Sequence, residues 1–381
     1  MMYYPLTTNT INKEDKNLAI KVIKSGNITR GYYNKSVEQY FSKKFNRFAL
    51  LVNSGSSANL LAFSLLTNNK SSYNLNTADE VIIPTLCWST SLYPIIQTGL
   101  KPVFVDVDIN TLNLSLEKIE KKITKKTKAI TVVHFLGVPV DMIKVQKIAK
   151  KYNLIILEDC ALALGAKIRK KHVGLYGDAG VFSFYPVKHI TTAEGGMLIT
   201  NNRKLSEIIK SKKAFGVDKN YSQRDLPGQY DVKELGLNYR MSEVHAAIGI
   251  QQMKKLKRFL NIRKRNFDLM FKNLKDLKNS FILKNIDKKI ISSNYSLCLI
   301  LDKNLVKKRA KIIKDLKNCG IGTSIYYPKP VPLLKYYKHK YSYKNSFFKN
   351  ASIVSENSIT LPVGPHINLK LLSNICKELK N

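Results

Sequence analysis

The sequence predicts an α/β protein with a large domain, built on one seven-stranded and mostly parallel sheet, and a smaller C-terminal α+β domain. Seven short apolar runs rich in β-branched residues indicate the strands, and amphipathic segments of helical period separate them. Several of these segments begin with Ser or Asp, which favour the N-cap of a helix. Strands that alternate with helices form a mostly parallel sheet covered on both faces.

The strands and helices of the large domain are expected in a regular order along the first two thirds of the chain. The expected strands are Phe48 to Val52, Val81 to Thr85, Val103 to Asp106, Ala129 to His134, Leu154 to Glu158, Val181 to Phe184 and Gly196 to Thr200. The expected helices are Ser57 to Leu66, Ser89 to Thr98, Ser115 to Ile123, Asp141 to Tyr152 and Arg203 to Phe215. Ligands of such sheets bind beyond the carboxyl ends of the strands, so polar residues directly after a strand are candidate functional residues.

The last third of the chain has a different pattern. The aperiodic, polar stretch Gly216 to Lys233 predicts a long loop, and Met241 to Phe259 has the apolar spacing of a helix. Beyond it we expect the following elements: a strand at Ile290 to Leu301, a helix at Lys307 to Cys319, a strand at Gly320 to Tyr327 and a short helix within Leu361 to Asn381. We therefore divide the chain into a large domain, residues 1–251 with an N-terminal segment 1–25, and a small domain, residues 252–381.

Composition excludes several classes of protein. The chain has 381 residues, 44% of them hydrophobic, which is normal for a globular protein and argues against general disorder. It has no apolar run near the roughly 20 residues of a membrane-spanning helix and no signal-peptide pattern, so a cytoplasmic location is expected. The five cysteines are widely spaced without a CxxC pair, which favours reduced thiols and no metal site.

The net charge is high. Lys and Arg number 64 against 27 Asp and Glu, which gives +37 at pH 7 and raises the alternative of a regulatory protein that binds nucleic acid or another polyanion. Only ten of these residues are Arg, and the lysines are spread along the chain without a basic arm or stripe. We therefore favour a general bias in composition, expect no specific nucleic-acid partner, and note that a positive field suits a phosphorylated substrate.

Four signals lie at predicted strand ends. The small-residue turn Asn53 to Ala58 opens a helix, where free N–H groups suit a phosphate. Asp159 ends a strand and can bind a cationic nitrogen. Lys188 lies between two strands in a segment with few charges, where its pKa can be lowered enough for it to attack a carbonyl. Trp88, the only Trp, could lie flat on a planar ring.

Together these four signals meet the demands of pyridoxal 5'-phosphate (PLP), namely a Schiff-base lysine, a pyridinium partner and a phosphate anchor.

With these signals in view, the sequence resembles the DegT/DnrJ/EryC1/StrS sugar aminotransferases. The motifs that carry the resemblance are Asn53-Ser54-Gly55-Ser56-Ser57-Ala58, Glu158-Asp159, Ser183-Phe184-Tyr185-Pro186-Val187-Lys188-His189-Ile190-Thr191-Thr192-Ala193-Glu194-Gly195-Gly196 and Gly236-Leu237-Asn238-Tyr239-Arg240-Met241-Ser242. They occur in the family's order and extend over nearly the whole chain. The resemblance implies the PLP-dependent aspartate-aminotransferase-like fold and a homodimer with active sites shared between the subunits.

The resemblance also implies roles for individual residues. Lys188 matches the Schiff-base lysine and Asp159 the carboxylate that faces the pyridine nitrogen. The other implied cofactor contacts are Trp88 on the ring, Ser56, Ser57 and Ser183 on the phosphate, and Asn238 on the phosphate of the neighbouring subunit. Tyr326 and His189 are the expected substrate contacts. His134 is expected to be a structural histidine at a strand end.

Two positions depart from the family's pattern. Leu162 replaces the Gln or His that usually lies near the phenolic oxygen of the cofactor, and a leucine side chain cannot hydrogen-bond there. Tyr326 replaces the His of a His-Tyr-Pro segment on the substrate side. Neither departure involves the lysine.

The function implied is transfer of an amino group from an amino-acid donor, L-glutamate, to a keto group of a nucleotide-linked 4-keto-6-deoxy sugar, for surface polysaccharide or glycan biosynthesis. A PLP-dependent or pyridoxamine-phosphate-dependent sugar dehydratase on the same scaffold is the alternative. Those dehydratases carry His where this chain has Lys188, and His189 is one position out of register.

Overall fold

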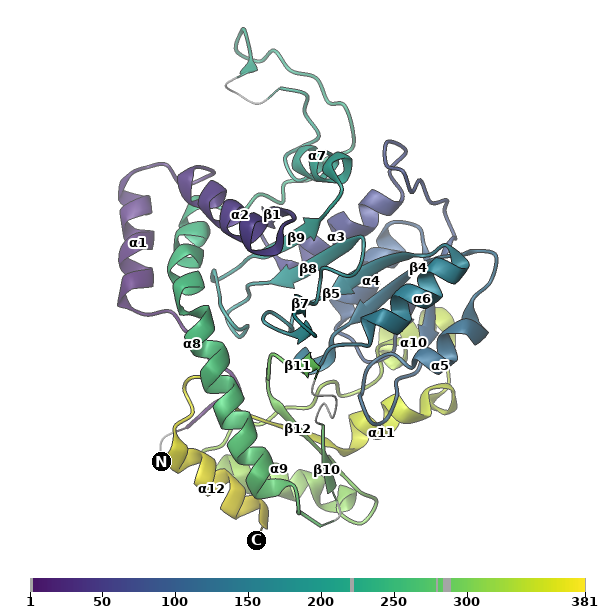
Figure 1. The fold of residues 1–381 in the computed structure, drawn as a ribbon, viewed down its shortest axis with the longest axis vertical. Helices are drawn as coiled ribbons and strands as arrows, with labels where there is room; N and C mark the ends of the chain where they lie inside the picture. Colours follow the sequence, from purple (N-terminus) through teal and green to yellow (C-terminus); the bar gives the residue numbers. More distant parts are fainter. Residues whose placement is uncertain (1–2, 220–222, 279, 284–288, 381) are drawn as a thin grey trace.

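In the computed structural model, which describes residues 3–219, 223–278, 280–283 and 289–380, a central sheet forms the core of the larger part of the protein (Figure 1). Within the described residues the sheet has seven strands in the order β1-β9-β8-β5-β4-β2-β3. The strands are β1 (Phe48–Val52), β2 (Glu80–Pro84), β3 (Lys101–Val105), β4 (Thr127–Val133), β5 (Ile155–Asp159), β8 (Ala179–Ser183) and β9 (Gly196–Thr200). β9 alone among these runs antiparallel, pairing with β1 and β8, so the seven-stranded, mostly parallel sheet is confirmed.

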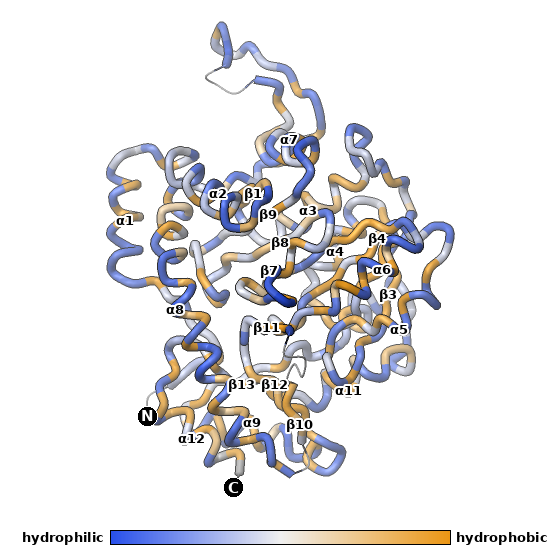
Figure 2. Tube along the Cα trace, viewed as in Figure 1, coloured by the Kyte–Doolittle hydropathy of each residue, from blue (hydrophilic) through white to orange (hydrophobic). Residues whose placement is uncertain are grey.

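Helices cover both faces of this sheet, because alternate residues of its strands are apolar on both sides. Leu50 and Val52 of β1 pack in one hydrophobic cluster, and Ala49 and Leu51 pack in another. The first cluster includes residues of α3 (Gly55–Leu66), α4 (Ser89–Gln97) and α7 (Arg203–Lys212), and the second includes residues of α2 (Tyr32–Phe45) and α6 (Met142–Tyr152). Figure 2 shows the resulting apolar sheet between helices with hydrophilic outer sides.

The long helix α8 (Glu243–Leu274) joins the two parts of the protein. It begins near the predicted position but continues 15 residues beyond Phe259, because Phe267, Met270 and Leu274 keep the apolar period within a basic stretch and pack in a third cluster. The boundary expected at Gln252 lies inside this continuous helix. There the Gln252 side chain donates to Asp15 of the N-terminal helix α1 (Lys13–Lys24) at 2.9 Å. The division into two domains stays a prediction.

The C-terminal part packs around a second, antiparallel sheet. This sheet consists of β10 (Ser280–Ile282), β12 (Leu297–Leu301) and β13 (Ser358–Leu361), with α9 (Arg309–Asn318) and α12 (Leu369–Lys380) against it. The short strands β6 (Lys167–Ile168), β7 (Lys171–His172) and β11 (Ile290–Ile291) form a third sheet. Among the described residues, the remaining α-helices are α5 (Leu116–Ile119), α10 (Lys335–Tyr341) and α11 (Lys349–Asn357).

Two predicted strands of this part differ in the structure. The expected strand from Ile290 to Leu301 is two strands, β11 and β12, which belong to different sheets. The expected strand from Gly320 to Tyr327 is wrong, because only single residues pair there, Ile321 with Tyr4 and Ser324 with Thr360. These partners are distant in sequence, so the local pattern could not reveal how short the pairing is.

The segment between α7 and α8 extends away from the rest of the protein (Figure 1). It contains the predicted loop Gly216 to Lys233, of which residues 220–222 lie outside the described residues. The outgoing and returning parts of this segment are joined by two isolated β-bridges, one between Ala214 and Asn238 and one between Val217 and Val232. Large apolar side chains on this segment are exposed, with Leu235 at 84%. In the described ranges, no helix combines the length and apolar character needed to cross a membrane.

Candidate active site

Several of the predicted site residues lie where parallel strands end at one edge of the central sheet. β1 leads into the turn before α3, β5 ends at Asp159, and β8 ends at Ser183. The turn and Ser183 are in close contact, since a Cβ atom on Gly55 would lie only 2.8 Å from Cβ of Ser183. A Cβ atom on Gly196, where β9 begins, would lie 2.4 Å from the carbonyl oxygen of Ser54. Glycine at both positions therefore permits this close packing.

The turn at the start of α3 has the geometry of an anion-binding helix N-terminus. Ser54 is the N-cap, and its Oγ accepts a hydrogen bond from the N–H of Ser57 at 3.0 Å and lies 2.9 Å from Ser57 Oγ. Ser56 and Ser183 are half-buried beside it, while Ser57 is buried. The first N–H groups of a helix have no acceptor within the helix, so this end suits a phosphate.

Asp159 is a buried carboxylate held by three donors. Its Oδ2 accepts hydrogen bonds from Ser91 Oγ at 2.7 Å and from Asn59 Nδ2 at 3.2 Å, and its Oδ1 accepts from the N–H of Ala161 at 3.0 Å. Ser91 and Asn59 were not among the predicted site residues. Each lies one helical turn inside a helix that opens with a predicted contact, and this spacing is the signal that could have found them.

Lys188 lies in the turn between β8 and β9 and is half-buried. Burial disfavours its charged form and lowers its pKa from 10.5 to about 8, while the negative charge of Asp159 acts in the opposite direction. The two side chains therefore lie within electrostatic reach of each other. The Nζ atom lies 5.8 Å from the ring centre of Tyr295, a residue that the sequence did not indicate.

Aromatic side chains from the C-terminal part lie beside this edge of the sheet. Trp88, which is 58% exposed, contacts Tyr327 with ring centroids 5.8 Å apart. Tyr326 is half-buried, and its hydroxyl lies 3.3 Å from that of Tyr295. The predicted substrate-side segment and the predicted ring-stacking residue are thus brought together.

His189 and Asn238 lie in surroundings that their predicted roles as substrate and cofactor contacts did not suggest. His189 is only 1% exposed, and its Nε2 lies 3.2 Å from the carbonyl oxygen of Ser293, so the structure does not bring its ring to an accessible surface. Asn238 is exposed, and its side-chain oxygen accepts a hydrogen bond from Arg240 at 3.3 Å. Leu162 is buried in the first hydrophobic cluster, and its backbone carbonyl accepts a hydrogen bond from Ser293 Oγ at 2.8 Å.

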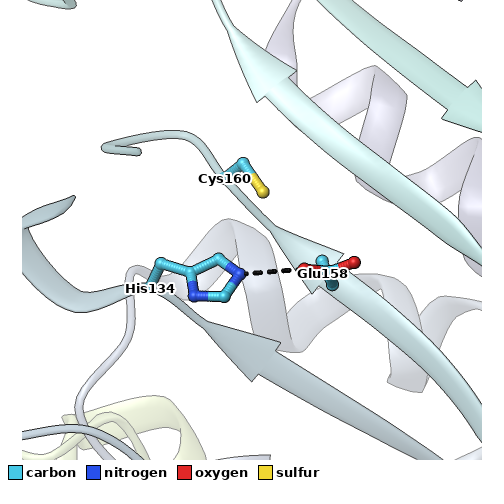
Figure 3. Close-up of side chains that lie close together, drawn as sticks. All are labelled: His134, Glu158 and Cys160. Carbon is cyan, nitrogen blue, oxygen red and sulfur yellow. Dashed lines mark hydrogen bonds and ion pairs between the residues drawn. The ribbon is translucent and has the colours of Figure 1, made fainter. Parts of the chain in front are cut away.

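A second polar cluster consists of His134 with Glu158 and Cys160, the two residues that flank Asp159 in the sequence (Figure 3). Glu158 accepts backbone hydrogen bonds from Gly174, Tyr176 and Gly177 at 2.6–2.7 Å and lies 3.2 Å from His134 Nε2. The other ring nitrogen, Nδ1, accepts from the N–H of Val140 at 3.1 Å. Both ring nitrogens of His134 are therefore used within the protein, which supports a structural role and leaves no lone pair for a metal.

The described residues fit PLP. The cofactor needs an amine for its aldehyde, a carboxylate for its ring nitrogen and an anion site for its phosphate. Lys188, the buried Asp159 and the α3 turn supply these groups at one sheet edge, and side chains at Gly55 and Gly196 would fill part of that edge.

Comparison with known proteins agrees with this chemistry. GDP-perosamine synthase of Escherichia coli O157:H7 is 32% identical over 382 residues, covering 100% of this chain and 98% of the relative. Among solved structures, Helicobacter pylori PseC, an aminotransferase involved in the biosynthesis of pseudoaminic acid, has a TM-score of 0.91 at 28% identity, covering 99% of this chain and 98% of that one. E. coli GDP-4-keto-6-deoxy-D-mannose-3-dehydratase with bound hydrated PLP has a TM-score of 0.87 at 29% identity over 100% of both chains.

These similarities confirm the predicted PLP-dependent aspartate-aminotransferase-like fold and PLP as the cofactor. Residues 9–380, nearly the whole chain, match a single family of enzymes. The protein belongs to the DegT/DnrJ/EryC1/StrS aminotransferase family.

Proposed function

We propose that this enzyme transfers an amino group from L-glutamate to the keto group of a nucleotide-linked 4-keto-6-deoxy sugar. The observation that carries the proposal is the amine of Lys188, with its lowered pKa, at the same sheet edge as the buried carboxylate of Asp159. Amino transfer needs a lysine that releases and recaptures the cofactor in every cycle. The similarity to GDP-perosamine synthase and PseC supports a sugar substrate.

Each residue has a distinct task in this proposal. When bound, PLP supplies an electrophilic aldehyde and a ring that takes up electrons from bonds to the amino-acid Cα. Lys188 Nζ provides the neutral amine for covalent attachment and later moves a proton from the donor Cα. Asp159, oriented by Ser91 and Asn59, holds a proton at the ring nitrogen. Ser56, Ser57 and Ser183 bind the phosphate, and Trp88 covers one face of the ring.

We further propose a homodimer in which each subunit completes the active site of the other through Asn238. The exposed side chain of Asn238 and the exposed apolar residues Leu226, Tyr230 and Leu235 on the projecting segment support this arrangement, because such residues favour an interface. The order of assembly, the cytoplasmic location and the part played in surface polysaccharide or glycan biosynthesis stay predictions.

The experiment combines absorbance spectroscopy with chemical trapping. The purified protein, incubated with PLP, is expected to develop an absorbance band that borohydride removes, and peptide mapping then finds the reduced cofactor on Lys188. Glutamate and a GDP- or dTDP-linked 4-keto-6-deoxy sugar are expected to yield 2-oxoglutarate and an amino sugar. A protein that binds PLP at a different lysine, or not at all, would contradict the proposal.

Sugar dehydration is a second candidate, because the chain is 29% identical to a sugar 3-dehydratase along its whole length. Lys188 argues against it, since the resemblance places a His at this position in such dehydratases. Incubating Lys188→Ala with the keto sugar and pyridoxamine phosphate separates the two. Retained loss of a sugar hydroxyl favours a dehydratase, whereas loss of all turnover favours the aminotransferase.

A further inference from the structure

Tyr295 lies beside the reactive lysine and is not among the residues that the family resemblance assigned a role. It is 1% exposed and lies between β11 and β12, and its ring centre is 5.8 Å from Lys188 Nζ. We propose that Tyr295 is a positioning residue, whose ring forms the apolar wall that keeps water from the amine of Lys188. This inference rests on the proposed role of Lys188 as the reactive amine.

The ring of Tyr295 is fixed from several sides. Arg263 of α8 donates from Nη1 to the carbonyl oxygen of Tyr295 at 2.8 Å, and its guanidinium carbon lies 5.8 Å from the ring centre. The hydroxyl lies 3.3 Å from that of Tyr326, and the two rings meet edge to face at 5.9 Å. His189 packs against the ring at 5.7 Å. A ring held by these contacts keeps the same orientation toward the amine of Lys188.

Arg263 reinforces this arrangement because it is a buried cation. It is 1% exposed, and within the described residues no carboxylate forms an ion pair with it. Tyr295 provides a carbonyl oxygen and an aromatic face for its guanidinium, the interactions that a buried arginine can make without an acid. Tyr295 therefore contacts both Arg263 of α8 and Lys188, and connects the helix to the lysine.

The consequence of such a wall is a larger neutral fraction of the amine. The titratable and charged groups around this region include Asp159 from β5, His189 from the same turn as the lysine, Arg263 from α8, and the phenols Tyr295, Tyr326 and Tyr327 from the C-terminal part. Asp159 favours the charged amine, and burial outweighs it. With a pKa of about 8 rather than 10.5, the neutral amine is roughly 300-fold more abundant at pH 7.

The two parts of Tyr295 can be tested separately. The hydroxyl contacts Tyr326, whereas the ring contacts the amine. Tyr295→Phe keeps the ring, so we expect the pKa of Lys188 to change by less than about 0.3. Tyr295→Ala admits water, so we expect the pKa to rise by at least one unit, a tenfold loss of neutral amine at pH 7.

The measurement is the pH dependence of modification of Lys188 by trinitrobenzenesulfonate in the full chain without added cofactor, followed by peptide mass spectrometry. Lys213 provides an internal control, because it is also buried but pairs with Glu38. Its modification is expected to be the same in all variants. If Tyr295→Ala does not fold, Tyr295→Gln, which also exposes the amine to water, replaces it.

An unchanged pKa of Lys188 in Tyr295→Ala would overturn the inference, as would an equal shift in Tyr295→Phe and Tyr295→Ala. The result does not depend on the proposed reaction, since no cofactor or sugar enters the measurement. Failure of borohydride trapping in the wild-type protein would contradict the proposed function instead, so the two failures are distinguishable.

Discussion

Ser91 donates a hydrogen bond to the Oδ2 atom of Asp159 at 2.7 Å, within a site where both side chains are buried. The same oxygen accepts from Asn59, so helices α4 and α3 together orient the carboxylate that ends β5. The turn proposed to bind the phosphate and Trp88, proposed to stack on the cofactor ring, open these same two helices. One pair of helices therefore positions most of the groups proposed to bind PLP.

Replacing Ser91 with Ala is expected to weaken PLP binding about tenfold, because hydrogen bonds to charged groups contribute roughly 1.5–3 kcal/mol. The dissociation constant follows from titration of the absorbance band with PLP. Ser206→Ala is the matched control, since Ser206 is similarly buried and its hydroxyl donates to the carbonyl oxygen of Arg203 in the same helix. Equal affinities of the two variants would show that Ser91 does not orient Asp159.

The positions of the large sheet's strands along the chain were predictable because each strand is a compact apolar run with its own flanking turn. The seven predicted runs all became strands, with ends shifted by at most two residues. The end of α8 was not predictable from composition, because its apolar residues Phe267, Met270 and Leu274 lie among lysines. The pairing of Tyr4 with Ile321 joins residues far apart in sequence, and no local pattern encodes it.

The site was predictable where a residue type is unusual in its surroundings. Lys188 was distinguishable because its segment carries little other charge. Lys213 follows Lys212 in a basic stretch that suggests a solvated surface, yet Lys213 is only 3% exposed. Its Nζ lies 2.9 Å from Glu38 and donates to the carbonyl oxygen of Leu51 at 2.7 Å. The partners of Tyr295 and Asp159 are likewise tertiary contacts that a single sequence does not reveal.

Lys213 leads to a prediction about stability. Lys213→Met is expected to lower the free energy of unfolding by about 2–3 kcal/mol, because it leaves Glu38 largely buried without its cation. PLP binding is expected to change little. Urea unfolding measures the first effect and cofactor titration the second, with Lys210→Met on the exposed side of α7 as control. A variant as stable as Lys210→Met would contradict the assignment of a buried ion pair.

The cluster of His134, Glu158 and Cys160 is expected not to bind zinc, although its ligand atoms lie within 4.8 Å of one another. A metal would have to displace the hydrogen bonds of both ring nitrogens of His134 and the backbone donors of Glu158. Calorimetric titration with zinc is therefore expected to show no stoichiometric binding at this cluster, and to give the same curve for the wild type and for Cys160→Ala. Stoichiometric binding that Cys160→Ala abolishes would establish a metal site instead.

The lowered pKa of Lys188 also predicts how stability depends on pH. Below pH 8 the amine is charged in both the folded and the unfolded chain, so folding bears the full cost of burying the charge. Between pH 8 and 10.5 the unfolded chain binds more protons than the folded chain, so stability rises with pH and this cost disappears.

Lys188→Met is therefore expected to increase the free energy of unfolding at pH 7, by on the order of 2 kcal/mol, and the gain should shrink towards pH 10. Urea unfolding without added PLP measures the difference at both pH values, with Lys257→Met on the exposed face of α8 as control. A gain of equal size at pH 7 and pH 10 would mean that the charge of Lys188 costs nothing in the fold, and that burial does not lower the pKa of its amine.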